Sequence, residues 1–157
     1  MILNCVLNGK KIQDDVPADM LLIDFVRKHH CYSVKRGCET ANCGLCTVWV
    51  NDKNVLSCSI LALSVEGKRI TTLEGVQEQA AEFGRFLAME GGEQCGFCNP
   101  GFIMNLLAME KELTDPTEED IREYLAGNLC RCTGFVSHGR AIEAYFAWKK
   151  EQKGEER

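Results

Sequence analysis

The apolar positions of the first 75 residues fall in short runs separated by turn residues, a pattern that predicts strands. Ile2 to Leu7 is suited to a β-strand and ends in Asn8-Gly9, two residues that accept the positive φ angles of a tight hairpin. Ile12 to Val16 is the expected return strand. Two later stretches predict a second hairpin and a last short strand: Thr47 to Ser57, with a polar turn at 51–54, and Arg69 to Leu73.

Apolar residues spaced three to four apart predict one helix in the first half and several in the second. The first helix carries Leu21, Leu22, Phe25 and Val26, with Asp19 as its expected N-cap. From residue 77 onward the helical pattern dominates, beginning with Gln77 to Met89. Later helices are expected to begin at Asn99-Pro100, at Thr117 in a capping box with Asp120, and at Ser137, and residues 151–157 form a charged tail that is expected to fray.

The composition excludes several classes of protein. An apolar fraction of 45% and a charged fraction of 26% over 157 residues indicate one or two folded domains, not disorder. The longest uncharged apolar-rich run, Val55 to Val65, is shorter than the roughly 20 residues of a membrane span. Scattered Lys and Arg and a net charge of −5 argue against a nucleic-acid partner. The first residues lack the basic and apolar regions of a signal peptide, so a cytoplasmic location is expected.

Ten cysteines are the unusual feature of this composition. In a reducing compartment, patterned cysteines indicate metal ligands or catalytic thiols more often than disulfides. The first set, Cys38, Cys43, Cys46 and Cys58, has the plant-type [2Fe–2S] ferredoxin spacing, with three ligands on one loop and one from a distance. Gly37 and Gly44 would let the main chain approach a cluster closely. A zinc site and unligated buried thiols are the weaker alternatives.

The second set contains two pairs of cysteines, and each pair precedes a predicted helix. Helix N-termini favour the negative charge of a four-thiolate centre, so a second [2Fe–2S] cluster is one interpretation. A four-thiolate zinc site and a thioredoxin-type redox pair remain alternatives on spacing alone. The four residues are Cys95, Cys98, Cys130 and Cys132.

The remaining chemistry-bearing residues are expected to have structural roles. Cys5 alternates with apolar strand residues, and Cys31 follows the first helix, so both are interpreted as packing residues. The three histidines have no spacing that suggests a catalytic triad. Trp49 and Trp148 are expected to be packing or interface anchors.

Three segments together resemble the small iron–sulfur subunit of xanthine dehydrogenase-type molybdenum hydroxylases. They are Arg36-Gly37-Cys38 through Cys46-Thr47-Val48, Gln94-Cys95-Gly96-Phe97-Cys98-Asn99-Pro100-Gly101-Phe102, and Gly127-Asn128-Leu129-Cys130-Arg131-Cys132-Thr133-Gly134-Phe135. The resemblance extends over about residues 1–150. It implies an α+β chain with a β-grasp ferredoxin-like domain at 1–76 and a four-helix bundle at 77–150, each holding one [2Fe–2S] cluster, before the tail at 151–157.

The resemblance also implies a large partner subunit that binds molybdopterin and molybdenum, and a medium partner subunit that binds FAD. The bundle cluster would lie beside the pterin, and matching positions suggest that Gln94 and the ligand Cys132 contact it. The expected function is electron transfer from molybdenum through both clusters to FAD, without a bond-making active site in this chain. The substrate stays open among xanthine-type purines, nicotinate, aldehydes and carbon monoxide.

Two features of the sequence qualify this expectation. The family loop between the first two ligands is usually glycine-rich, whereas here it contains Ala41, which would be strained at a positive φ. Asn99 replaces a common threonine and is expected to keep its capping role. A free-standing ferredoxin and a zinc-stabilised interaction module are the rival classes, although a plant-type ferredoxin does not need the helical half.

Overall fold

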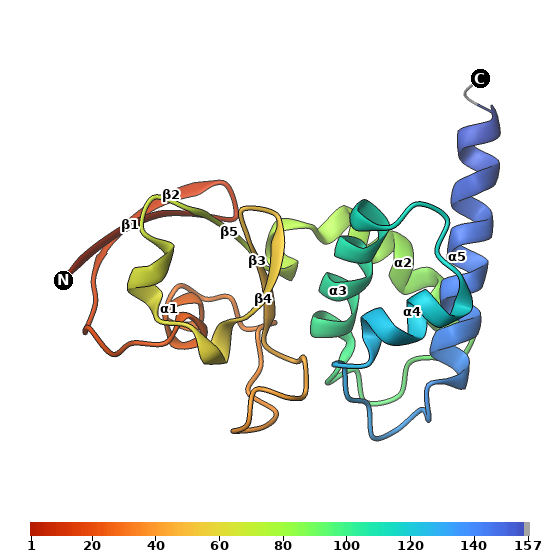
Figure 1. Cartoon of the computed structure of the whole chain (residues 1–157), viewed down its shortest axis with the longest axis horizontal. Coiled ribbons are helices and arrows are strands. Elements are labelled where there is room, and N and C mark those ends of the chain that lie inside the picture. The colour runs from red at the N-terminus through yellow and green to blue at the C-terminus, as the bar shows by residue number, and fades with distance from the viewer. Residues whose placement is uncertain (156–157) are drawn as a thin grey trace.

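A computed structural model describes the backbone of residues 1–155 and the side chains of residues 1–152. The sheet half, residues 1–76, contains one five-stranded sheet, and the helical half, residues 77–155, lies beside it (Figure 1). The strand order is β2-β1-β5-β3-β4. The strands are β1 (Ile2–Leu7), β2 (Lys10–Asp15), β3 (Thr47–Val50), β4 (Lys53–Leu56) and β5 (Arg69–Thr71).

Two hairpins and one parallel pair build the sheet. Asn8 and Gly9 have φ angles of 49° and 80° and join β1 to β2, as the sequence predicts. The second hairpin turns more tightly than expected, because Asn51 and Asp52 both have positive φ and β4 already begins at Lys53. β5 pairs parallel with β1 and antiparallel with β3, so it joins the two hairpins.

Helix α1 (Leu22–Lys28) covers the sheet with four buried apolar residues. The prediction that Asp19 caps this helix is wrong: the N-cap position is Leu21, and it makes no side-chain capping bond. The backbone N–H of Leu22 instead donates to the carbonyl of Ile60 at 2.9 Å, so a distant segment satisfies the helix end. Short 3₁₀ turns complete this half: η1 (Ser57–Ser59), η2 (Ala62–Val65) and η3 (Leu73–Gly75).

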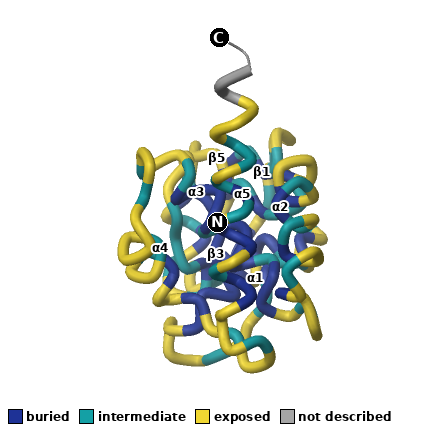
Figure 2. The backbone as a smooth tube through the Cα atoms, turned by 90° about the vertical axis from the view of Figure 1, so that its right-hand side faces the viewer, coloured by how far each residue is buried: buried dark blue, intermediate teal, exposed yellow. Residues whose placement is uncertain are grey.

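Four helices share one core in the second half, where buried residues concentrate in the interior of the molecule (Figure 2). Phe83, Leu106 and Tyr145 are fully buried there. None of the described helices is both long and apolar enough to cross a membrane. The helices are α2 (Gln77–Met89), α3 (Asn99–Glu112), α4 (Glu118–Leu125) and α5 (Val136–Glu155).

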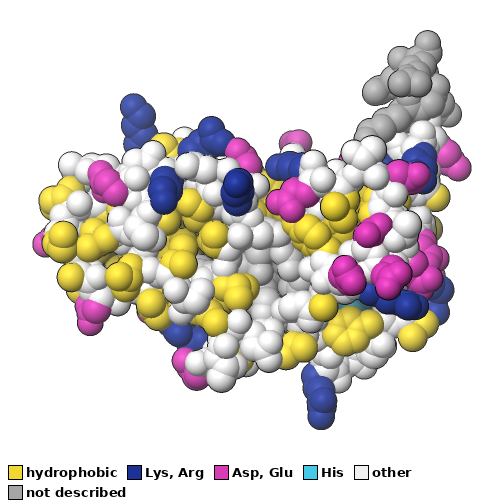
Figure 3. Space-filling view, in the orientation of Figure 1, with side chains coloured by type: hydrophobic (Ala, Val, Ile, Leu, Met, Phe, Trp, Pro, Cys, Tyr) yellow, Lys and Arg dark blue, Asp and Glu magenta, His cyan; other side chains and the backbone are white. Residues whose placement is uncertain are grey.

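The helix boundaries confirm some predictions and correct others. Thr117 and Asp120 form the predicted capping box at α4, and acidic side chains gather over the helical half (Figure 3). Asn99 is not the cap of α3: Cys98 holds that position, and the Asn99 amide donates to Glu93 instead. Ser137 lies inside α5, which begins one residue earlier. α5 also continues through the predicted frayed tail to Glu155, and residues 156–157 lie outside the described chain.

The two halves meet where β3 packs against α3. Trp49 of β3 is buried in the helical core, and its Nε1–H donates to the carbonyl of Met104 at 3.1 Å. The ammonium of Lys111 lies 3.9 Å from the centre of the Trp49 ring. Trp49 therefore anchors the interface, one of the two roles expected for it.

Candidate metal centres

The first set of cysteines lies on the loop before β3 and on η1 directly after β4. Cys38 lies near Cys43, and Cys58 lies near Cys46, because each neighbour influences the pKa of the other thiol. The hairpin β3–β4 thus returns Cys58 to the loop, as the sequence predicts. The four thiols thus fall into two neighbouring pairs.

Backbone N–H groups of this loop favour a thiolate at its outer edge. Asn42 N lies 3.4 Å from Cys38 Sγ, and hydrogen bonds from Asn42 and Thr40 lower the pKa of Cys38 to about 6. Burial, followed by the neighbouring Cys46, raises the pKa of Cys58 to about 12. The pKa of Cys38 is low and that of Cys58 is high, so the thiols of this set do not ionise together at one pH. A bound cation would stabilise all four thiolates at once.

Ala41 in this loop has a φ of 51°, so the strain that the sequence suggested is present. Replacing Ala41 with glycine is expected to raise the free energy of unfolding by about 0.5–1 kcal/mol, because glycine adopts this conformation without strain. Denaturant unfolding of the cluster-loaded chain measures this. Thr40→Gly is the matched control: its φ is not positive, so it is expected to lower stability. Equal stability changes in both variants would contradict the strain at position 41.

The second set also forms two contacting pairs. Cys95 and Cys132 are exposed, with their sulfurs 3.5 Å apart. Cys98 is buried at the N-cap of α3 and within reach of Cys130, whose sulfur lies 3.2 Å from Thr133 Oγ1. Burial, followed by Cys130, raises the pKa of Cys98 to about 12. Burial also opposes ionisation of Cys130, but hydrogen bonds from Thr133 outweigh it and lower its pKa.

The pairing of the thiols favours a two-iron centre over a single zinc ion bound by all four sulfurs of a set. A tetrahedral zinc ion with Zn–S bonds of about 2.3 Å holds all four sulfurs about 3.8 Å apart. In the described chain, no three thiols of either set lie within 4.8 Å of one another. Two separate pairs suit a [2Fe–2S] rhomb, in which each iron takes two thiolates. The donor set and its arrangement fit this cluster.

One backbone hydrogen bond joins the two sets. Leu129 N donates to the carbonyl of Cys43 at 2.9 Å, and Leu129 directly precedes Cys130. Gly44, with a φ of 73°, makes this approach possible, because a Cβ there would lie 2.5 Å from the carbonyl of Gly127. The approach of Gly44 to a cluster stays a prediction, and the structure adds that Gly44 makes room for the helical half.

Comparison with known proteins gives the family. Residues 5–88 match a 2Fe-2S iron-sulfur cluster binding domain, and residues 72–143 match a [2Fe-2S] binding domain. The xanthine dehydrogenase iron-sulfur-binding subunit of Escherichia coli O157:H7 is 41% identical over 140 residues, covering 85% of this chain and 86% of that protein. The chain belongs to the iron–sulfur subunit family of xanthine dehydrogenase-type oxidoreductases.

Similar iron–sulfur chains occur in oxidoreductases with other names. The nicotinate dehydrogenase small FeS subunit of Eubacterium barkeri is 36% identical over 143 residues, covering 89% of this chain and 91% of that subunit. The structure of quinoline 2-oxidoreductase from Pseudomonas putida 86 matches with a TM-score of 0.84 and 32% identity, covering 94% of this chain and 96% of that one. In aldehyde oxidase 2 of Rattus norvegicus the match spans only 11% of a longer chain.

Gln94 lies on the surface of the iron–sulfur subunit beside the exposed pair of cysteines. Its side chain is exposed and, among the described residues, forms no hydrogen bond. Large apolar side chains are exposed near these cysteines in the sequence, namely Phe97, Leu129, Phe135 and Val136, with Val136 69% exposed.

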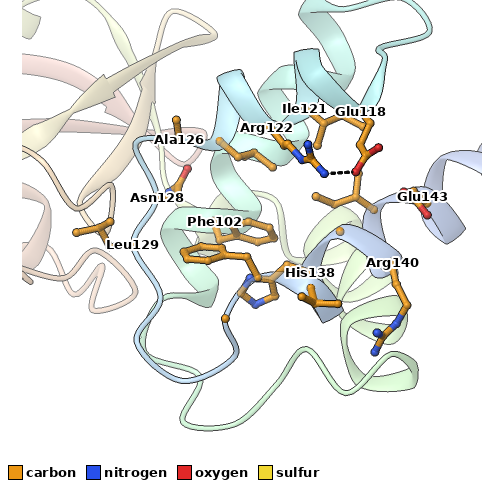
Figure 4. Close-up of a pocket in the computed structure, with 16 residues that line it drawn as sticks. Phe102, Glu118, Ile121, Arg122, Ala126, Asn128, Leu129, His138, Arg140 and Glu143 are labelled. Atoms are coloured by element: carbon orange, nitrogen blue, oxygen red, sulfur yellow. Dashed lines mark hydrogen bonds and ion pairs between the residues drawn. The ribbon is translucent and has the colours of Figure 1, made fainter.

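A cavity of about 600 Å³ lies between α4 and the first turns of α5, and Phe102 of α3 and the segment before α5 complete its lining (Figure 4). Phe102 and His138 stack at one side of it, and the ion pair between Arg122 and Glu118 lies at the other. Its lining is mainly apolar and contains no cysteine. No role was predicted for His138, but the structure buries it beside Cys98 and Cys130 of the second set. Its position in the first turn of the last predicted helix, shortly after Cys132, could have indicated that it lies near these thiols.

Proposed function

We propose that this chain is the electron-transfer subunit of a xanthine dehydrogenase-type molybdenum hydroxylase. In this proposal residues 1–76 form a β-grasp ferredoxin-like domain, and residues 77–150 form a four-helix bundle. Each domain holds one [2Fe–2S] cluster, and when bound each cluster accepts and releases one electron at a time. The proposed ligands are Cys38, Cys43, Cys46 and Cys58 for the first cluster, and Cys95, Cys98, Cys130 and Cys132 for the second.

The observation that carries the proposal is the backbone link between the two sets. Leu129 N donates a hydrogen bond to the carbonyl of Cys43, and Leu129 is joined to Cys130 by a peptide bond. A proposed ligand of one set is thereby connected to a proposed ligand of the other. The packing of Trp49 against α3 fixes the separation of the two sets. A rigid, short connection between two redox centres is what a relay needs, and an isolated ferredoxin has no use for it.

The exposed cysteines of the two sets support a direction of electron transfer. Cys95 and Cys132 open to the surface beside Gln94, which supports contact with a molybdopterin on a large partner subunit. Cys38 is partly exposed on its own loop, which supports transfer toward FAD on a medium partner subunit. The loops of both sets lie along the same lower edge of the molecule (Figure 1). A cytoplasmic location remains part of the proposal.

The deciding experiment is dye reduction by the complex purified natively through this chain. Xanthine, hypoxanthine, nicotinate, quinoline and simple aldehydes are offered in parallel, since the relatives and structural neighbours carry these names. Reduction with one class would establish the partner set and name the substrate class. Absence of both larger subunits and of dye reduction would favour a free-standing ferredoxin.

Replacing Gln94 with alanine is expected to leave both clusters intact and to slow their reduction by substrate about tenfold, because a hydrogen bond to the pterin is lost. Stopped-flow reduction of the clusters within the complex measures this rate. Gln79→Ala on α2 is the matched control, because its exposed side chain lies on a helix without proposed ligands. Unchanged reduction in Gln94→Ala would count against the pterin contact.

A further inference from the structure

His138 is a buried histidine whose proton position the structure determines. Its residue is 2% exposed, and Nε2 lies 3.1 Å from the carbonyl oxygen of Gly92. A carbonyl only accepts hydrogen bonds, so Nε2 carries the proton. With the proton on Nε2, a neutral ring has its lone pair on Nδ1.

The free lone pair has no partner within the described chain. His138 Nδ1 is buried and forms no hydrogen bond there. The ring is held by Phe102, which stacks on it at 4.6 Å between centroids, and by Phe135, which meets it edge-on at 5.8 Å. A buried acceptor without a hydrogen-bond partner destabilises the fold, so Nδ1 is available to a ligand.

Two sulfurs of the second set lie beside this ring. Cys98 Sγ, Cys130 Sγ and a ring nitrogen of His138 all lie within 4.8 Å of one another, the one such group of three among the described residues. Zinc bound to two thiolates and one imidazole needs donor atoms about 3.5–3.8 Å apart. The group can reach that spacing by side-chain adjustments of about an ångström, which staggered rotamers allow.

We propose that Cys98, Cys130 and His138 form a metal site of their own when the chain lacks its clusters. The site binds one Zn²⁺ through two thiolates and Nδ1, and a water molecule takes the fourth position. Both cysteines bind as thiolates, and His138 binds as the neutral imidazole. The outer pair, Cys95 and Cys132, is not required.

This site goes beyond the electron-transfer role. Zinc and the second cluster would compete for Cys98 and Cys130, so one excludes the other. Of the two sets, only the second has such a group in the described chain. Zinc would therefore obstruct assembly of the second cluster more strongly than assembly of the first.

Cobalt titration of the full-length, cluster-free chain under anaerobic conditions tests the site. Co²⁺ replaces Zn²⁺ and gives visible ligand-field bands in a tetrahedral thiolate site. Two cysteines of the first set are changed, Cys38→Ser and Cys58→Ser, so that the second set alone is observed. Adding His138→Ala is expected to weaken Co²⁺ binding at least tenfold and to change the spectrum, whereas adding Cys95→Ser leaves both unchanged.

His30→Ala is the matched control, because it removes an exposed histidine of the sheet half. Zinc K-edge absorption of the same chain carrying His138 provides a measurement that does not depend on the folding of a variant. Two sulfurs and one imidazole around zinc are expected. Four sulfurs, or Co²⁺ binding that His138→Ala leaves intact and Cys95→Ser abolishes, would overturn the proposal. Either result leaves the electron-transfer proposal standing, because no cluster takes part in the test.

Discussion

Replacing Cys95 with serine is expected to remove the second cluster and to leave the first in place. The iron content should fall from about four atoms per chain to about two, since each centre contains two irons. A hydroxyl is a poor ligand for iron beside a thiolate, and loss of one ligand lowers metal affinity by at least about 10–100-fold. In the proposed complex, substrate would still reduce the molybdenum centre of the large subunit, but electrons would no longer pass to FAD.

Cys95 is the ligand to replace because its substitution is not expected to disturb the folding of the chain. Cys95 is exposed, whereas Cys98 is buried at the start of α3, where a substitution would also disturb the core. Cys5→Ala is the matched control, because Cys5 is buried in the sheet half and belongs to neither set. Iron and sulfide analysis with electron paramagnetic resonance counts the clusters. Two intact clusters with unchanged flavin reduction in Cys95→Ser would contradict its assignment as a ligand.

Local signals predicted the elements of this fold where a short stretch of sequence determines the structure. Helix α2 has the predicted bounds, Gln77 to Met89, because its apolar stripe ends in a glycine pair. The Asn8-Gly9 turn and the Thr117 capping box are equally local. The spacing of the cysteines also predicted which thiols would gather, because ligands of one centre come from short loops.

Features that depend on contacts between distant segments could not be predicted. The carbonyl of Ile60 satisfies the first turn of α1, which made a cap at Asp19 unnecessary. Glu93 binds the side chain of Asn99 and draws it away from the helix end. His138 has no ligand spacing in the sequence, since Cys98 comes to it from a different helix.

Replacing Gly101 with alanine is expected to be the most damaging single change at the junction of the two halves. A Cβ at this position would lie 2.3 Å from the carbonyl oxygen of Gly44 and 2.9 Å from the Cα of Leu45. Both are backbone atoms, which cannot move aside as a flexible side chain can. Overpacking of this kind costs about 1–3 kcal/mol or more, which corresponds to a fall in melting temperature of roughly 3–10 °C for a chain of this size.

The same change would separate the two redox centres. Forcing α3 away from Gly44 moves the neighbouring carbonyl of Cys43, which accepts the hydrogen bond from Leu129. We expect Gly101→Ala to retain both clusters and to weaken the magnetic interaction between them. Gly84→Ala is the matched control: it lies within α2 with open space around it, so it should stabilise the chain by about 0.5–1 kcal/mol. Equal thermal stability and equal spectra in the two variants would mean that this contact does not hold the halves together.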